Sequence, residues 1–262
     1  MDPKIFNPQS IALVGASKVP GKLGYDILSN LVNLGFEGKL YPVNPKGDEV
    51  LGLPIYHSVS DLPEVPDLTL VIIPAPGVNA VVEECGQKGI RNVVIISAGF
   101  KEVGGEGIAR EEELKNIVDT YDINLVGPNC LGVINTKILM NASFAEGMPK
   151  FGNVSLVSQS GAMAVAMIDW AYESGLGFAK IISMGNKTGI TENELLAYLG
   201  DDPETKVILM YLESIADGTR FLELARKISL TKPIIIVKSG TSEAGTKAIS
   251  SHTGSLAGSD NA

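Results

Sequence analysis

The chain has 262 residues, a formal net charge of −9 and 45% hydrophobic residues, with 29 glycines and a single tryptophan. This composition is typical of a soluble, glycine-rich α/β protein and excludes the fibrous and disordered classes. The negative charge argues against a protein that binds a nucleic-acid backbone, because such proteins need clustered lysine and arginine. The length suffices for about two domains, each with its own core.

Membrane, disulfide and metal chemistry are all disfavoured. No apolar run approaches the roughly 18 residues of a membrane span, and the N-terminus lacks the regions of a secretory signal, so we expect a cytoplasmic protein without membrane contact. Cys85 and Cys130 are too few for a disulfide framework or a zinc cluster, and His57 and His252 are too few for a multi-histidine site. We expect reduced thiols and no resident metal ion.

Short β-branched runs recur through the first half of the chain, with helical patterns between most of them, such as residues 25–34 and 78–88. The runs lie at residues 10–15, 39–43, 68–73, 92–97 and 123–127. They are apolar almost throughout instead of alternating, as expected when helices cover both faces of a sheet. This half therefore predicts a parallel sheet built from βαβ units.

The alternation restarts after a segment rich in glycine and asparagine at residues 136–152. Strands are expected at residues 154–158, 179–184, 207–213 and 234–238, and helices at 162–173, 192–199 and 218–228. We predict a second doubly wound domain and divide the chain into residues 1–136 and 137–262. Because the last strand is followed by a Gly/Ser-rich segment without a closing helix, we interpret the chain as a truncated part of a longer protein.

A glycine-rich loop follows the first predicted strand, in the run VGASKVPGKLG. Gly15, Gly21 and Gly24 leave backbone N–H groups free to face an anion at the N-terminus of the next helix. Ser17 occupies the place of the second glycine in the dinucleotide motif GxGxxG. The loop predicts a site for a nucleotide phosphate, and the alternative is a tight turn with no ligand.

The ends of the next strands carry further candidates. The second strand ends in NPKG, where Lys46 stands in place of the acidic residue that a NAD site usually has. A lysine there suits a phosphorylated ribose, either the 3′-phosphate of coenzyme A or the 2′-phosphate of NADP, unless it is a solvated surface charge. Two later strand ends, IPAP and SAGF, place Pro74, Ser97 and Gly99 at the same edge of the sheet, where they would line a cleft.

The second half offers a phosphate site and a histidine. The motif SQSG follows a strand and opens a helix, so Ser160 and Gly161 could hold phosphate at its positive end, or Ser160 is a plain helix cap. His252 lies in a run of Ser, Thr and Gly, a poor place for a core histidine and a good one for a reactive side chain. Glu213, at a strand end, could hold its Nδ1–H so that Nε2 attacks a phosphoryl group, or it is an exposed charge.

The ordered set GASKVPGKLG, NPKG, IPAP, GPNCLG, SQSGAM and SHTGSLAGSD resembles the α subunit of ADP-forming acetyl-CoA synthetases, in the succinyl-CoA synthetase superfamily. The resemblance covers essentially the whole chain. It implies an N-terminal Rossmann-like CoA-binding domain followed by a flavodoxin-like domain. It also implies roles for residues in the motifs: coenzyme A contacts from Gly15, Ser17, Lys46, Pro74, Ser97 and Gly99, Asn129 near the thioester, phosphate at Ser160 and Gly161, and a phosphorylated His252 steadied by Glu213.

The implied reaction converts acyl-CoA and phosphate to acyl phosphate and CoA, transfers the phosphoryl group to His252, and then transfers it to ADP. The chain has no Walker-type phosphate loop, and the family places ADP or ATP with Mg²⁺ on a separate ATP-grasp subunit or domain, so a hetero-oligomer is expected. Cys130 would be a packed neighbour. Two other readings are the regulatory part of a protein lysine acetyltransferase and a non-catalytic CoA sensor. The combination of His252, Glu213 and SQSG favours the synthetase.

Overall fold

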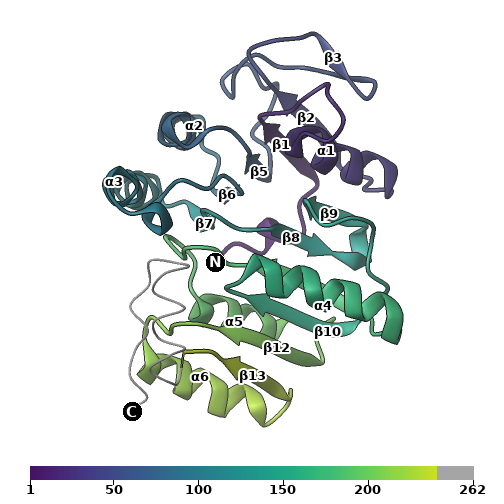
Figure 1. The fold of residues 1–262 in the computed structure, drawn as a ribbon, viewed down its shortest axis with the longest axis vertical. Coiled ribbons are helices and arrows are strands. Elements are labelled where there is room, and N and C mark those ends of the chain that lie inside the picture. The colour runs from purple at the N-terminus through teal and green to yellow at the C-terminus, as the bar shows by residue number, and fades with distance from the viewer. Residues whose placement is uncertain (241–262) are drawn as a thin grey trace.

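The computed structural model describes residues 1–240 of the chain. Two β-sheets with flanking helices lie one above the other, with the first half of the chain in the upper part of Figure 1 and the second half in the lower part. The predicted α/β class is confirmed. His252 lies outside the described residues.

The first sheet has five parallel strands in the order β2-β1-β5-β6-β7. Its strands are β1 (Ser10–Val14), β2 (Lys39–Val43), β5 (Leu68–Val71), β6 (Asn92–Ile95) and β7 (Asn124–Val126). After β2 the chain returns past β1 to form β5 on the other side. In open α/β sheets, ligands bind beyond the carboxyl ends of the strands at such a reversal, here between β1 and β5.

Three helices accompany this sheet: α1 (Leu23–Asn33), α2 (Val78–Lys88) and α3 (Glu106–Tyr121). Helix α2 covers the residues that its sequence pattern predicted, and it ends where Gly89 adopts a left-handed conformation, with a φ of 89°. Helices α2 and α3 pack against each other, whereas α1 contacts both β1 and strand β9 (Met140–Ser143) of the second sheet. Helix α1 therefore lies between the two sheets.

The second sheet has six strands in the order β13-β12-β10-β11-β8-β9. They are β8 (Gly132–Asn135), β9 (Met140–Ser143), β10 (Phe151–Ser158), β11 (Phe178–Ser183), β12 (Val207–Leu212) and β13 (Ile234–Lys238). Strands β10 to β13 are parallel, as predicted, and the chain reverses between β10 and β12. The hairpin of β8 and β9, which the sequence pattern did not reveal, joins the edge at β11 in antiparallel orientation.

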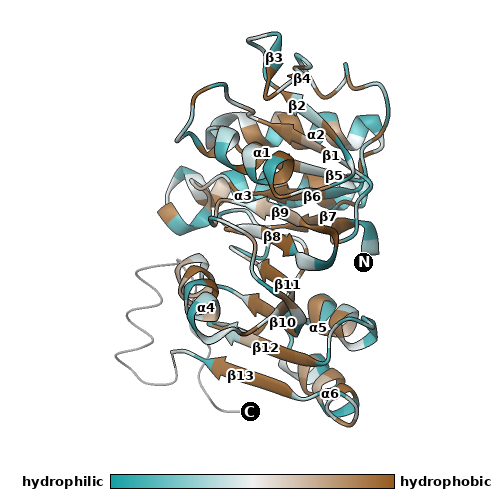
Figure 2. Ribbon diagram, turned by 90° about the vertical axis from the view of Figure 1, so that its right-hand side faces the viewer, coloured by the Kyte–Doolittle hydropathy of each residue, from teal (hydrophilic) through white to brown (hydrophobic). Residues whose placement is uncertain are grey.

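The helices of the second half flank its sheet on opposite sides. Figure 2 shows α4 (Gly161–Ser174) on one side, and α5 (Glu192–Asp201) and α6 (Gly218–Ser229) on the other. Each begins at a side-chain cap, from Ser160, Thr191 and Asp217 respectively. The three helices predicted for this half are confirmed to within two residues at either end.

The remaining elements are short. A two-stranded ribbon is formed by β3 (Glu49–Val50) and β4 (Leu53–Pro54), and single 3₁₀ turns occur at Pro3–Ile5, Ala75–Gly77, Lys101–Val103 and Thr136–Ile138. Within residues 1–240, none of the helices has both the length and the apolar character needed to cross a membrane. Over the same residues, no three His, Cys, Asp or Glu side chains are grouped so that they could hold a metal ion.

One continuous hydrophobic core joins the two sheets. It includes Leu13 and Val94 from the first sheet, Val133 and Ile182 from the second, and Leu195 from α5. Burying each such side chain contributes roughly 1.5–3 kcal/mol. This shared core holds the carboxyl ends of the two sets of strands at a fixed distance. A site formed between the two sheets depends on that distance.

Candidate functional site

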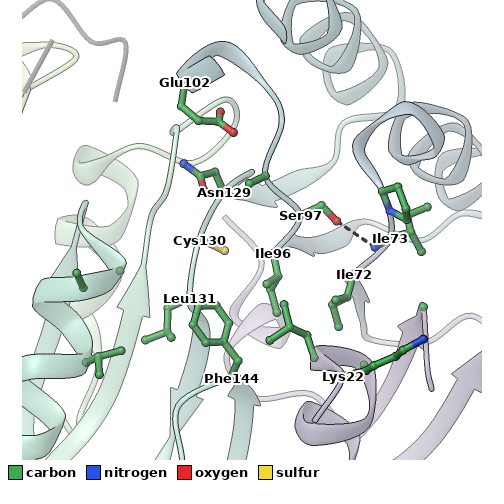
Figure 3. A pocket seen from close by; sticks show the side chains of 18 of the residues that line it. Lys22, Ile72, Ile73, Ile96, Ser97, Glu102, Asn129, Cys130, Leu131 and Phe144 are labelled. Carbon is green, nitrogen blue, oxygen red and sulfur yellow. Dashed lines mark hydrogen bonds between the residues drawn. The ribbon is translucent and has the colours of Figure 1, made fainter. Parts of the chain in front are cut away.

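A cavity of about 1050 Å³ lies between the two sheets at the carboxyl ends of their strands (Figure 3). The loops after β1, β5, β6 and β7 of the first sheet and after β10 and β12 of the second contribute to it. Most of the predicted site residues line this one cavity: Gly15, Ser17, Pro74, Ser97, Asn129, Ser160, Gly161 and Glu213. The structure thus brings together candidates from both halves of the chain.

The loop between β1 and α1 forms one end of the cavity. Gly15 has a φ of 99°, and a Cβ atom there would collide with the carbonyl oxygen of Ile72; a Cβ on Gly24 would collide with the carbonyl of Gly15. Both positions therefore need glycine for the helix to start this close to the strand ends. The side chain of Lys22, at the N-cap, makes no capping hydrogen bond and lines the cavity. The positive end of α1 and a cation thus face the same space.

Lys46 does not line the cavity and is exposed. Its turn is nevertheless tied to the glycine loop, because the Asn44 amide donates to the carbonyl of Ala16 at 2.7 Å and the Asn44 oxygen accepts from the N–H of Lys46 at 2.8 Å. Lys46 therefore stands on a turn fixed beside the β1–α1 loop. Its contact with a ligand phosphate stays a prediction.

The ends of β5 and β6 are joined at the cavity wall. The Ser97 hydroxyl accepts a hydrogen bond from the N–H of Ile73 at 3.0 Å, as Figure 3 shows. Gly99, two residues later, does not line the cavity. Its N–H donates to the carboxylate of Glu102 at 2.5 Å, and its carbonyl accepts from the Arg110 guanidinium. Glu102, which the sequence analysis missed, lines the cavity in its place.

Asn129 lies where the two sheets meet. It adopts a left-handed conformation with a φ of 59°, after a cis peptide bond between Gly127 and Pro128. Its N–H donates to the carbonyl of Ser97 at 3.0 Å, and its side-chain amide lies 3.4 Å from the side-chain oxygen of Asn186 in the second half. Asn129 is therefore held by hydrogen bonds from both halves of the chain where it lines the cavity.

Cys130 follows directly and is buried, with its thiol donating to the carbonyl of Ile95 at 3.3 Å. Burial raises the pKa of the Cys130 thiol to about 12. Since only a thiolate is a good nucleophile, the thiol is unreactive at neutral pH. Cys130 is therefore a packed residue of the cavity wall, as the sequence analysis expected.

The start of α4 forms the opposite end of the cavity. The Ser160 hydroxyl accepts from the N–H of Met163 at 3.3 Å, so Ser160 is the helix cap and lines the cavity at the same time. Gly161 is the first residue of the helix, and the positive helix end faces the cavity. Glu213, only 6% exposed, reaches the same space from the end of β12.

The cavity also has an apolar wall that the sequence analysis did not foresee. Leu131 and Phe144 lie side by side in Figure 3, and Val165, one turn into α4, completes this side of the lining. Phe144 follows the unpredicted hairpin of β8 and β9, so no local signal marked it. Gln159, also missed, stands within the SQSG motif, which could have drawn attention to it.

A polar network locks the two halves together beside the site. The Asn186 amide donates to Glu102 at 2.6 Å and to Glu111 at 2.7 Å, and the Lys101 ammonium lies 2.9 Å from Glu111. Burial acts to raise the pKa of Glu102, but the hydrogen bonds from Asn186 and from the N–H groups of Gly99 and Phe100 outweigh it, so the pKa is lowered. Glu102 is therefore ionised when it holds the turn of Gly99.

Both halves of the chain match known domain families. Residues 9–136 match a CoA binding domain, and residues 151–262 match a succinyl-CoA ligase-like flavodoxin domain. The chain is 47% identical, over 98% of its length, to acetate–CoA ligase [ADP-forming] I of Archaeoglobus fulgidus, of which it covers 37%. It is 45% identical to the α subunit of acetate–CoA ligase [ADP-forming] I of Pyrococcus furiosus, covering 98% of this chain and 56% of that subunit.

Among solved structures, the dinucleotide-forming acetyl-coenzyme A synthetase 1 of Candidatus Korarchaeum cryptofilum, in complex with phosphate and ADP, superimposes with a TM-score of 0.94 at 42% identity. The match covers 98% of this chain and 55% of that one.

A glycine-rich loop and a second helix N-terminus at one cavity define the class: a two-part α/β protein in which a CoA binding domain is followed by a flavodoxin-like domain. The chain belongs to the family of NDP-forming acyl-CoA synthetases, which includes the α subunits of ADP-forming acetate–CoA ligases. It spans between about a third and slightly more than half of the length of the relatives described above.

Proposed function

We propose that this chain is the CoA-binding and phosphohistidine-carrying part of an NDP-forming acyl-CoA synthetase, and that it acts with an ATP-grasp subunit or domain. The observation that carries this proposal is the single cavity shared by the β1–α1 loop, the start of α4 and Glu213. In this proposal residues 1–136 bind CoA, and residues 137–262 carry out phosphoryl transfer.

Coenzyme A would bind along the first sheet. Its pyrophosphate would lie at the N-terminus of α1, near Gly15, Ser17 and Lys22, where backbone N–H groups and a cation favour an anion. Lys46 would reach the 3′-phosphate from its neighbouring turn. The pantetheine arm would then pass Pro74 and Ser97, which brings the thioester to Asn129.

The acyl group and phosphate would meet at the start of α4. Phosphate bound at Ser160 and Gly161 would attack the thioester carbon, so that the C–S bond breaks and CoA leaves as the thiolate. The acyl chain of the resulting acyl phosphate would lie against Leu131, Phe144 and the adjoining apolar wall. The helix N-terminus stabilises the negative charge that develops on the oxygens.

His252 would then take the phosphoryl group. Its Nε2 would attack phosphorus, the bond to the carboxylate oxygen would break, and the free carboxylate would leave. Glu213 would accept the Nδ1–H and stabilise the positive charge on the imidazole. Support for His252 comes from its SHTGSLAG sequence, since the residue itself lies beyond the described part of the chain.

The nucleotide and Mg²⁺ would be held by the partner. The related synthetase of Candidatus Korarchaeum cryptofilum was solved with phosphate and ADP, and its chain is almost twice as long as the matched region. Phosphohistidine would pass its phosphoryl group to ADP at the ATP-grasp site. The two parts would therefore work as a hetero-oligomer or as one longer chain.

The overall reaction tests this proposal directly. Full-length protein with its ATP-grasp partner, Mg²⁺, ADP, phosphate and an acyl-CoA should form ATP and free CoA in equal amounts, and omission of phosphate should stop both. A protein that binds CoA but forms no ATP from any of a series of acetyl, branched-chain and aryl thioesters would contradict the proposal and favour a CoA sensor.

A further inference from the structure

Three strand ends of the second sheet converge beside the cavity. Strand β10 leads into Gln159, β12 leads into Glu213 and Ser214, and β11 is followed by the loop that carries Lys187. Strands β10 and β12 are neighbours at the point where the chain order reverses, so their outgoing loops part from each other there. The ladder between the two strands holds Gln159 itself, whose N–H donates to the carbonyl of Tyr211 at 3.0 Å, and the loop that carries Glu213 needs a further link beyond it.

The side chain of Gln159 supplies this link. Its Oε1 atom accepts hydrogen bonds from the N–H groups of both Glu213 and Ser214, the second at 2.9 Å, and its Nε2 atom donates to the carbonyl of Ser214 at 3.0 Å. Gln159 is 8% exposed, so these bonds are shielded from water. One carboxamide thus binds both the backbone N–H and the carbonyl of Ser214, the residue next to Glu213.

Lys187 also holds Ser214. Its ammonium donates to the Ser214 carbonyl at 3.0 Å and to the Ser214 hydroxyl at 3.1 Å, and it forms an ion pair of 2.9 Å with the buried Glu192. Its backbone is left-handed, with a φ of 60°, an unusual conformation for a residue with a long side chain. The backbone beside Glu213 is therefore fixed by hydrogen bonds from two other strand ends.

Gln159 also lies at the cavity in which the phosphoryl transfer is proposed to take place. Together with Glu213 it lines the main cavity, and both line a smaller adjoining cavity of about 60 Å³ with Lys187 and Ser214. Gln159 directly precedes Ser160, whose hydroxyl caps α4. A single side chain thus connects the helix start that would hold phosphate with the residue that would hold the imidazole.

We propose that Gln159 is a positioning residue, which sets the place of the Glu213 carboxylate relative to the N-terminus of α4 during phosphoryl transfer. This inference rests on the proposed function. A displacement of the accepting carboxylate by about 1 Å is enough to slow a reaction up to roughly 100-fold, because the imidazole and the phosphoryl group would no longer be aligned.

A double-mutant cycle separates this role from a merely structural one. The rate of phosphohistidine formation is measured in full-length protein with the ATP-grasp partner, Mg²⁺ and γ-labelled ATP, for the wild type, Gln159→Met, Glu213→Gln and the double variant. Because Gln159 acts through Glu213, we expect Gln159→Met to slow labelling about 10- to 100-fold in the wild type and less than about threefold in the Glu213→Gln background. The affinity for CoA should stay within about twofold of the wild type.

A matched control is available at the amino end of β6 in the first sheet. Asn92 is 2% exposed, and its carboxamide also bridges to backbone, with Nδ2 donating to the carbonyl of Asp67 at 2.9 Å. Asn92→Leu should lower the unfolding temperature without changing the labelling rate in either background. Should Gln159→Met fail to fold, Gln159→Glu goes through the same cycle. It keeps an acceptor oxygen for both N–H groups but loses the Nε2 donor to the Ser214 carbonyl, so the slowing should be smaller and should again require Glu213.

The two possible failures are distinguishable. Equal loss in both backgrounds, or a folded Gln159 variant labelled at the wild-type rate, would overturn the positioning role while wild-type labelling still supports the proposed function. A wild-type protein that binds CoA but takes no acid-labile label would overturn the proposed function, and the positioning role with it.

Discussion

The hydroxyl of Ser97 accepts a hydrogen bond from the N–H of Ile73 at 3.0 Å, across the ends of two neighbouring strands. Both residues line the cavity, and Ser97 also accepts through its carbonyl from the N–H of Asn129 at 3.0 Å. The side chain and backbone of one serine thus connect three successive strand ends of the first sheet. This fixes the wall along which we place the pantetheine arm of CoA.

Ser97→Ala should weaken CoA binding about fivefold and lower the free energy of unfolding by about 1 kcal/mol, because the N–H of Ile73 loses its partner. Calorimetric titration and denaturant unfolding measure the two effects. Ser10→Ala is the matched control: its hydroxyl accepts from the N–H of Asp67 at 3.0 Å, at the amino end of the same sheet. It should lose similar stability and bind CoA normally, so equal loss of affinity in both variants would speak against a role for the Ser97 wall.

Lys46→Ala should weaken CoA at least tenfold and 3′-dephospho-CoA hardly at all, because one charge-assisted contact with the 3′-phosphate is lost. Parallel titrations with the two ligands give the comparison. Lys39→Ala, at the other end of β2, removes an equal charge and should leave both affinities unchanged. If Lys46→Ala reduced both affinities by the same factor, Lys46 would not contact the 3′-phosphate.

Most of the architecture was predictable because it depends on local apolar runs. Strands such as Ser10–Val14 and Ile234–Lys238 are nearly continuous in β-branched or aliphatic residues. Capped helices such as Gly218–Ser229 begin at a capping residue that can be recognised in the sequence. The hairpin of β8 and β9 was missed for a physical reason. Its buried positions include Asn135, Asn141 and Ser143, each 0% exposed and satisfied by hydrogen bonds, so its sequence does not look like that of a buried strand.

The candidate site was predictable to the extent that topology dictates it. Residues within two positions of the end of a parallel strand, such as Gly15, Ser160 and Glu213, must gather at one edge of the sheets. The direction of a turn is set by tertiary partners, so Gly99 faces Glu102 and Arg110 and not the cavity. Phe144 gains its place only from contacts between distant segments, which sequence spacing does not encode, whereas Gln159 directly follows β10 and could have been predicted.

Low pH should weaken the hydrogen bond between Asn186 and Glu102, which connects the two halves of the chain. The pKa of Glu102 is lowered in the folded state, so its contribution to stability is present above the unfolded value of about 4.5 and is lost as the pH falls below it. Glu102→Gln should therefore lower stability at pH 7 and flatten the fall in the free energy of unfolding between pH 5 and pH 3, measured by denaturant titration. The exposed Glu37→Gln serves as control, and an equally steep acid limb in Glu102→Gln would contradict the assignment.

Neither cysteine thiol should react with an alkylating reagent in the folded protein. Burial raises the pKa of Cys130 and of Cys85 to about 12, so iodoacetamide at pH 8 should alkylate both only in unfolded protein. Because both pKa values are raised from 9.0, their stabilising contribution is complete below about pH 9 and is lost as the pH rises toward 12. Cys130→Ala should keep phosphoryl transfer within about fivefold, as should the distant Cys85→Ala. Fast native alkylation of Cys130 with loss of activity would make it a reactive residue.

The most direct measurement is phosphorylation of His252 itself. Full-length wild-type protein, with an ATP-grasp partner, Mg²⁺ and γ-labelled ATP, should take up an acid-labile, base-stable label that CoA and a carboxylate then discharge, and His252→Ala should take up none. A label that survives in His252→Ala, or a wild-type protein that binds CoA and stays unlabelled, would contradict the assignment of this chain as the phosphohistidine carrier.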